Sequence, residues 1–157
     1  MEQGTGNKQQ GTGNLEHGFR RLRAWQKADN LAVAIFLTSR HLQRQDAWLR
    51  DQVCRAAVSV PANIAEGYTR GALKDYLRFL DIARGSLAEV EYYLHFIERS
   101  ALLPADQLAH LAGLRGEAGA LLFALSQSLR DKVRAGGPWQ RGSLGEEISD
   151  YASIVEE

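Results

Sequence analysis

Two polar stripes on neighbouring predicted helices hold the residues that could do chemistry, because carboxylates, an arginine and a serine recur there at three- and four-residue spacing. The stripes comprise Gln52, Arg55, Ser59, Asn63, Glu66, Asp75, Arg78, Ser86 and Glu89. Neither stripe contains a histidine, and Ser59 has no evident base to activate its hydroxyl. Buried charges must be paired, so we favour a structural polar network that joins helices or subunits. A ligand or nucleic-acid contact is the alternative, and we predict that the protein is not an enzyme.

Basic residues gather at two places, and both could bind phosphate. Arg20, Arg21, Arg23 and Lys27 lie around Trp25, and a second group near the end of the last predicted helix comprises Arg130, Lys132 and Arg134. In an antiparallel bundle these two places can lie near each other, so together they could neutralise a nucleic-acid backbone. The alternative is a pair of solvated helix ends, where late cations favour the helix dipole.

Metal and cofactor chemistry has little support in the sequence. The four histidines are scattered, and only Glu91 and His95 have the spacing that would place two ligands on one helix face. A solvated pair explains that spacing equally well. The single cysteine, Cys54, excludes an intrachain disulfide and suits a small buried position. We therefore predict no metal and no cofactor.

Four helices must position these residues. Apolar side chains recur with a 3.6-residue period over about 19–44, 47–66, 72–100 and 104–135. Asp46 is placed to cap the second helix, Gly67 to stop it, and Pro61 to bend it. Gly85 and Ser86 remove bulk from the third helix, which would permit close approach by a neighbour. No stretch alternates with period two, so we predict an all-α, antiparallel up-down four-helix bundle.

The termini differ from this bundle in composition, and the chain divides into three parts. Residues 1–18 form a Gly-rich arm that we expect to be flexible, 19–135 the bundle, and 136–157 an acidic tail. The bundle carries 17 Lys/Arg against 12 Asp/Glu, a balance of +5, while the tail is −4 and the arm −1. Ser143 and Glu146 have the spacing of a capping box, and Leu144, Ile148, Tyr151 and Val155 recur at helical spacing after Ser143. The tail is therefore either disordered or a short amphipathic helix that folds against a partner or the bundle.

Three motifs in this order resemble a known family. They are residues 19–28 (FRRLRAWQKA), 52–67 (QVCRAAVSVPANIAEG) and 80–89 (LDIARGSLAE). Together they resemble the four helix bundle proteins encoded within intervening sequences of bacterial 23S ribosomal RNA genes, over about 19–135. The resemblance implies a ring-like homopentamer without enzymatic activity. The family is similar in fold to the accessory proteins of diversity-generating retroelements, which are basic pentamers that bind nucleic acid and a reverse transcriptase.

These observations lead to an expected function of a binding rather than a catalytic kind. We expect a homo-oligomeric, nucleic-acid-associated scaffold, with RNA as the favoured partner and DNA as another. The alternative is a protein–protein adaptor, for example for a reverse transcriptase or another neighbouring enzyme. The N-terminus lacks the pattern of a secretion signal and no apolar run approaches about 18 residues, so we expect a cytoplasmic protein without a membrane partner.

Overall fold

The computed structural model describes residues 18–136, and the elements within this range are all helical. Four long helices form the bundle: α1 (Arg23–Ser39), α2 (Ala47–Thr69), α3 (Leu73–Arg99) and α4 (Ala105–Ala135). Two short 3₁₀ helices, η1 (Gly18–Arg21) and η2 (Arg44–Asp46), precede α1 and α2. The predicted arm, apart from Gly18, and the predicted tail helix lie outside the described residues.

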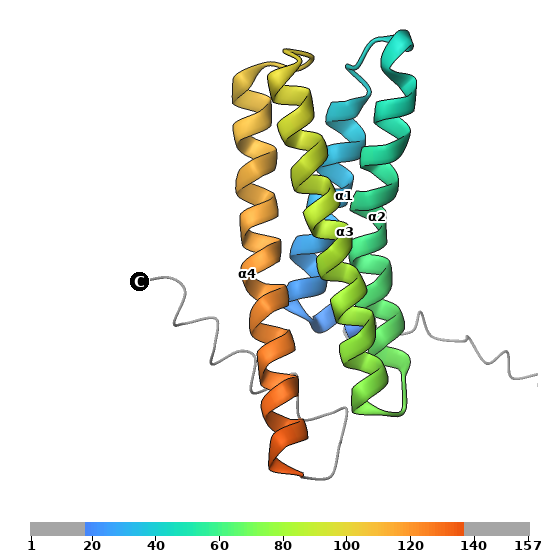
Figure 1. Ribbon diagram of the computed structural model, residues 1–157, viewed down its shortest axis with the longest axis vertical. Helices are drawn as coiled ribbons and strands as arrows, with labels where there is room; N and C mark the ends of the chain where they lie inside the picture. The colour runs from blue at the N-terminus through green and yellow to red at the C-terminus, as the bar shows by residue number, and fades with distance from the viewer. Residues whose placement is uncertain (1–17, 137–157) are drawn as a thin grey trace, which may run out of the picture.

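The helices alternate in direction and pack as an antiparallel bundle, as predicted (Figure 1). The main contacts join α1 to α2, α2 to α3, α3 to α4, and α4 back to α1. As a result α1 and α3 are diagonal neighbours across the core. The start of α1, the α2–α3 turn and the end of α4 all lie in the lower half of Figure 1, with α4 extending furthest down.

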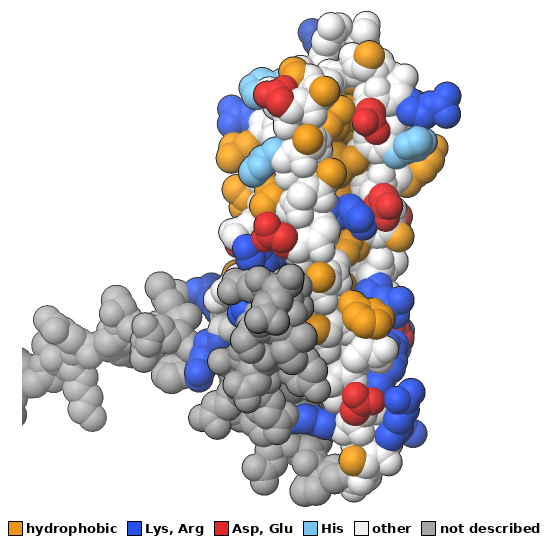
Figure 2. All heavy atoms as spheres, turned by 90° about the vertical axis from the view of Figure 1, so that its left-hand side faces the viewer, with side chains coloured by type: hydrophobic (Ala, Val, Ile, Leu, Met, Phe, Trp, Pro, Cys, Tyr) orange, Lys and Arg blue, Asp and Glu red, His pale blue; other side chains and the backbone are white. Residues whose placement is uncertain are grey.

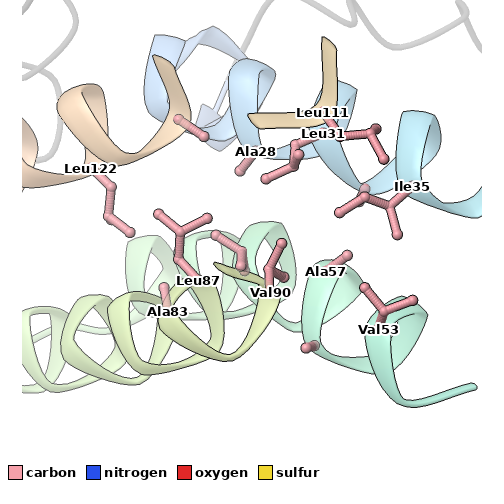
Figure 3. Close-up of a cluster of buried hydrophobic side chains, with 14 of the residues drawn as sticks. Ala28, Leu31, Ile35, Val53, Ala57, Ala83, Leu87, Val90, Leu111 and Leu122 are labelled. Atoms are coloured by element: carbon pink, nitrogen blue, oxygen red, sulfur yellow. The ribbon is translucent and has the colours of Figure 1, made fainter. Parts of the chain in front are cut away.

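The core is built from the apolar stripes of all four helices, because each helix turns one side chain in three or four inward. Figure 3 shows side chains from the four helices meeting along the bundle axis. The stripe of α4, for instance, contributes Leu111, Leu122, Leu125 and Leu129, which are at most 2% exposed. The whole core lies between Leu22 and Leu129.

The first helix is shorter than its periodic pattern indicated. A helix over 19–44 was expected, but α1 begins at Arg23 after a 3₁₀ turn and ends at Ser39. At Ser39 the hydroxyl donates to the carbonyl oxygen of Phe36 at 3.1 Å and lies 3.2 Å from the Cys54 sulfur. The backbone then turns, with the His41 and Leu42 amides donating to the Thr38 and Ser39 carbonyl oxygens, and Leu42 still lies in the core.

The boundaries of α2 correct two further expectations. Asp46 occupies the position before the helix, but its side chain makes no capping hydrogen bond. Gly67 does not stop the helix, which continues through Pro61 and Gly67 to Thr69. Gly67 is instead buried against α3, where an added Cβ would lie 2.7 Å from Cδ2 of Tyr76. The close approach expected at Gly85 and Ser86 occurs at Ser86, whose hydroxyl lies 2.8 Å from that of Ser59 on α2, but not at Gly85, where no neighbouring element lies within 4 Å of an added Cβ.

Helix α4 has enough length and apolar character to cross a membrane by those two criteria alone. Its 31 residues are rich in alanine and glycine as well as leucine. In the fold its leucine face packs into the bundle core, as the core helix of a soluble protein does. Pro104 precedes its first turn, and Gly136 ends it with a left-handed φ of 66°, close to the predicted range of 104–135.

Candidate nucleic-acid interface

Side-chain contacts between helices define which residues lie at the same height along the bundle. Lys27 on α1 pairs with Glu117 on α4 at 2.6 Å, and the Ser59 hydroxyl on α2 meets that of Ser86 on α3 at 2.8 Å. We place the boundary between two halves of the described chain close to these contacts. We call residues 18–27, 56–89 and 117–136 the basic half, and the remaining 28–55 and 90–116 the neutral half.

The net positive charge of the bundle falls in the basic half. Its 11 Lys/Arg (20, 21, 23, 27, 70, 74, 78, 84, 130, 132, 134) face 6 Asp/Glu (66, 75, 81, 89, 117, 131), a balance of +5. The neutral half has six of each, a balance of zero. Figure 2 shows blue side chains gathered along the lower part of one face, with red, blue and pale blue ones alternating further up. All seven residues of the predicted nucleic-acid interface therefore lie in one half of the molecule.

The N-terminal basic group is held by a small aromatic corner. Phe19 packs edge-on against Trp25 with ring centroids 5.2 Å apart, and the Gln26 amide donates to the Arg20 carbonyl oxygen at 2.8 Å. These contacts fix η1 against α1 and α2 and leave Arg20 and Arg21 exposed. Lys27 is less available for phosphate, because its ammonium group hydrogen-bonds Glu117 and lowers the pKa of that carboxyl.

The C-terminal basic group lies on the opposite flank of the same half. Arg130 on α4 donates to Asp81 on α3 at 2.7 Å, and Arg134 pairs with Asp131 on its own helix at 3.1 Å. Since η1 contacts α1 and α2, while Arg130 faces α3, the two groups share an end of the bundle without forming one patch. The expectation that the two groups could lie near each other holds only to the extent that both lie in the basic half, and their separation comes from the order of the helices.

An open groove between α3 and α4 adds cations that sequence reasoning did not assign to nucleic acid. This basic groove has a volume of about 550 Å³ and is lined by Lys74, Leu77, Arg78, Asp81, Ile82 and Arg130. Lys74 and Arg78 are exposed, and neither pairs with a carboxylate of the described residues. Asp81 lies between Arg130 and Arg84, at 2.7 and 3.4 Å, and so holds both guanidinium groups in place. The spacing of Lys74, Arg78 and Ile82, four residues apart, was the available signal in the sequence.

The predicted polar network exists only at its centre. Ser59 and Ser86 share a hydrogen bond, and the Asn63 amide donates to the Ser59 carbonyl and hydroxyl oxygens at 2.7 and 3.0 Å. Gln52 is half-buried, while the charged members are exposed: Arg55, Glu66, Asp75, Arg78 and Glu89. Glu66 pairs with Arg70 instead, and Arg78 lies in the basic groove. Among the described residues of the predicted network, the bond between the Ser59 and Ser86 hydroxyls joins α2 to α3, and the Asn63 amide supports Ser59 from within α2.

The described residues also bear on metal chemistry. Among residues 18–136, no group of three or more His, Cys, Asp or Glu side chains could hold a metal ion. Glu91 forms an ion pair with Arg115 at 2.9 Å, which occupies the carboxylate that could have acted with His95.

Comparison with known proteins accounts for this fold. A family model described as "23S rRNA-intervening sequence protein" matches residues 20–124. The chain belongs to this family. The match covers the three resembling motifs except Phe19, and it ends before Arg130, Lys132 and Arg134, so the basic end of α4 lies beyond the matched region.

A solved structure is similar to this member of the family in fold. It is a protein of unknown function from the S23 ribosomal protein family of Bacteroides thetaiotaomicron, with a TM-score of 0.63 and 24% sequence identity. The alignment covers 66% of this chain and 97% of that chain. A search of curated proteins gave no match.

Two apolar patches on the neutral half are the features that sequence reasoning missed. The α1 patch consists of Val33, Phe36 and Leu37, which are 50–56% exposed. The α2–α3 patch consists of Trp48, Tyr92 and Phe96, whose rings lie edge-on or tilted at centroid distances of 6.0 Å (Trp48–Phe96) and 6.5 Å (Tyr92–Phe96). Because α1 and α3 are diagonal, these patches lie on different sides of the bundle. The i, i+3, i+4 spacing of the α1 patch was present in the sequence, on the face opposite the core stripe.

Proposed function

We propose that the protein is a non-catalytic, homo-oligomeric cytoplasmic scaffold that binds structured RNA through its basic half and assembles through its neutral half. One observation carries the proposal: the net charge of +5 lies entirely in one half of the bundle. If the same charges were spread evenly over the bundle, no part of its surface would attract phosphate strongly. Segregated along the axis, the same charges make one end of the molecule a phosphate-binding surface.

The family description supports RNA over other polyanions, because it connects these proteins with 23S ribosomal RNA genes. The charge per subunit is modest, and Lys27, Arg130 and Arg134 already have carboxylate partners. Binding by a single subunit is therefore weak. An oligomer repeats the surface, and its subunits engage one RNA with a combined affinity that exceeds that of each.

The two apolar patches support self-assembly of a particular kind. Exposed aromatic and aliphatic side chains gathered on a small protein mark interaction surfaces. The α1 patch and the α2–α3 patch differ in residues and lie on different sides, so a contact between them is heterologous. Heterologous contacts close into rings when the rotation allows. A homopentamer, which the family resemblance implies, is such a ring.

A test of RNA binding compares two triple variants of equal charge change. Arg130→Gln/Lys132→Gln/Arg134→Gln removes three cations from the basic half, and Arg40→Gln/Arg44→Gln/Arg99→Gln removes three from the neutral half. We expect the first to weaken binding of a structured RNA and to lower the slope of log affinity against log salt by about two to three. The second leaves both quantities near the wild-type values.

The measurement is a gel-shift titration of RNA and duplex DNA at several salt concentrations. Absence of binding by the wild-type protein at low salt would refute the RNA proposal and favour the adaptor function. Equal loss in the two triple variants would show that the basic half is not the binding surface.

A further inference from the structure

The basic groove between α3 and α4 combines charge with exposed apolar surface, which a site for nucleic-acid phosphate alone does not require. Lys74, Arg78 and Arg130 outnumber the single carboxylate of Asp81. Leu77 and Ile82 lie beside them, and the Ile82 side chain is 40% exposed. The groove therefore fits an occupant that is both acidic and amphipathic.

The chain itself contains a segment with these properties. In residues 144–155, Leu144, Ile148 and Tyr151 recur at four and three residues, and Glu146, Glu147 and Asp150 lie among them. Residues 136–157 have a balance of −4, which offsets most of the +5 of the bundle. The charge of the tail is thus opposite in sign and similar in size to the charge of the surface.

The segment is also attached within reach of the groove. Helix α4 ends at Ala135, and Gly136 turns the chain with a left-handed φ of 66°. Arg130 precedes Gly136 by six residues, or about 9 Å along the helix axis. Residues 137–143 can span about 23 Å when extended, which is more than enough to reverse direction and return to the groove.

We propose that residues 144–155 dock in the basic groove of their own chain and occupy its cations. Leu144, Ile148 and Tyr151 lie against Leu77 and Ile82, and the acidic side chains face Lys74, Arg78 and Arg130. The docked segment competes with RNA for this surface and makes RNA binding more selective. The docking does not depend on RNA, whereas the competition rests on the function proposed above.

Photo-crosslinking in the full-length protein tests the docking without RNA. Benzoylphenylalanine replaces Tyr151, and mass spectrometry locates the crosslink after irradiation. We expect crosslinks to residues 73–85 or 126–135 of the same chain, with a yield that falls as salt is raised. Lys74→Gln/Arg78→Gln reduces the yield about three- to tenfold, since each removes one exposed ion pair. The matched control, Arg40→Gln/Arg44→Gln, leaves it unchanged.

Crosslinks that fall elsewhere, or an equal yield in the groove variant and the control, would overturn the proposal. So would crosslinks between chains, which a mixture of ¹⁴N- and ¹⁵N-labelled protein identifies. A separate titration with RNA uses Glu146→Gln/Glu147→Gln/Asp150→Asn, for which we expect several-fold tighter binding. If crosslinking succeeds and neither protein binds RNA, the docking stands and the RNA function fails.

Discussion

Gly67 allows α2 and α3 to pack closely because it has no side chain. A Cβ at this position would approach Cδ2 of Tyr76 to 2.7 Å and Cβ of Phe79 to 2.9 Å. Tyr76 is fully buried, so its ring cannot move away into solvent. The glycine costs α2 helical stability but permits the contact that closes the lower end of the bundle.

A pair of glycine substitutions separates these two effects. We expect Gly67→Ala to lower the free energy of unfolding by about 1–3 kcal/mol through overpacking. Gly85→Ala, at an exposed position in α3 with open space around it, is expected to raise that free energy by about 0.5–1 kcal/mol through helix propensity. Urea denaturation at one fixed protein concentration measures both changes. A stabilised Gly67→Ala variant would contradict the close-packing argument.

Because Tyr76 is buried, we expect the folded protein to lose stability at alkaline pH. Burial, with a smaller contribution from the nearby Tyr68, raises its pKa above the ordinary value near 10. Below that ordinary value both states keep the proton, and the contribution to stability is fully present. As the pH rises further, the unfolded chain loses the proton while the folded chain keeps it, so the free energy of unfolding falls.

The corresponding experiment compares wild type with Tyr76→Phe and Tyr92→Phe by urea denaturation at pH 8 and pH 10.5. We expect Tyr76→Phe to lose about 0.5–1 kcal/mol less than wild type between the two pH values. In the isolated subunit Tyr92 is 59% exposed, so at a protein concentration below that of assembly its variant is expected to show the same alkaline loss as wild type. Equal alkaline losses in all three proteins would exclude Tyr76 as the source.

At the scale of helices, Asp81 connects α3 with α4 and also limits the charge of the basic groove. Its carboxylate accepts from Arg130 on α4 and from Arg84 on α3. All three side chains are at least 30% exposed, so the pairs contribute little to stability. Their larger effect is to hold the two guanidinium groups and to cancel one positive charge.

Asp81→Asn is therefore expected to strengthen RNA binding about two- to fivefold at low salt and to steepen its salt dependence. The control is Asp106→Asn, which removes an exposed carboxylate at the start of α4 in the neutral half. Gel shifts at two salt concentrations make the comparison. Weaker binding by Asp81→Asn would mean that the orientation of the arginines matters more than the charge that Asp81 cancels.

The helices themselves were predictable from the sequence because their buried faces follow a regular period. The stripe Tyr76, Leu80, Ala83, Leu87, Val90, Leu94, Ile97 is buried in α3 as the period required. The ends of α1 and α2 were not predictable, since tertiary contacts decide them. Leu42 follows the buried period of α1 although the helix ends at Ser39, so periodicity does not mark that end, and α2 continues through Gly67, which packs closely against α3.

The candidate site was predictable in part, for a related reason. Counting charges along the chain located Arg130, Lys132 and Arg134 at one end, but periodicity does not reveal which helix faces which. The pairing of Arg130 with Asp81, and hence the basic groove, depends on the contact between α3 and α4. The polar stripe was overestimated because a shared helix face does not show that side chains meet: its charged members are exposed, and only Ser86 of that set is buried.

At the scale of the whole molecule, the two apolar patches predict how copies join. Phe36→Glu disables the α1 patch and Trp48→Glu the α2–α3 patch, and both side chains are more than half exposed, so the bundle is expected to fold. Each variant alone is expected to be a monomer. Mixed in equal amounts, they retain one complementary pair of patches and form a heterodimer.

Light scattering and native mass spectrometry follow these species. A heterodimer is expected only if the contact joins two different patches, and a mixture that remains monomeric would exclude this pairing. Wild-type protein that is monomeric at all concentrations would refute the assembly proposal as a whole.

The net positive charge lies in one half of the bundle, and this has a consequence for such a ring. Cyclic symmetry places every subunit in the same orientation relative to the ring axis, and no operation exchanges the two rims. Where the bundle axes run along the ring axis, all the basic halves meet on one rim. Only one rim of the ring then binds RNA, and the opposite rim is free to bind a different partner.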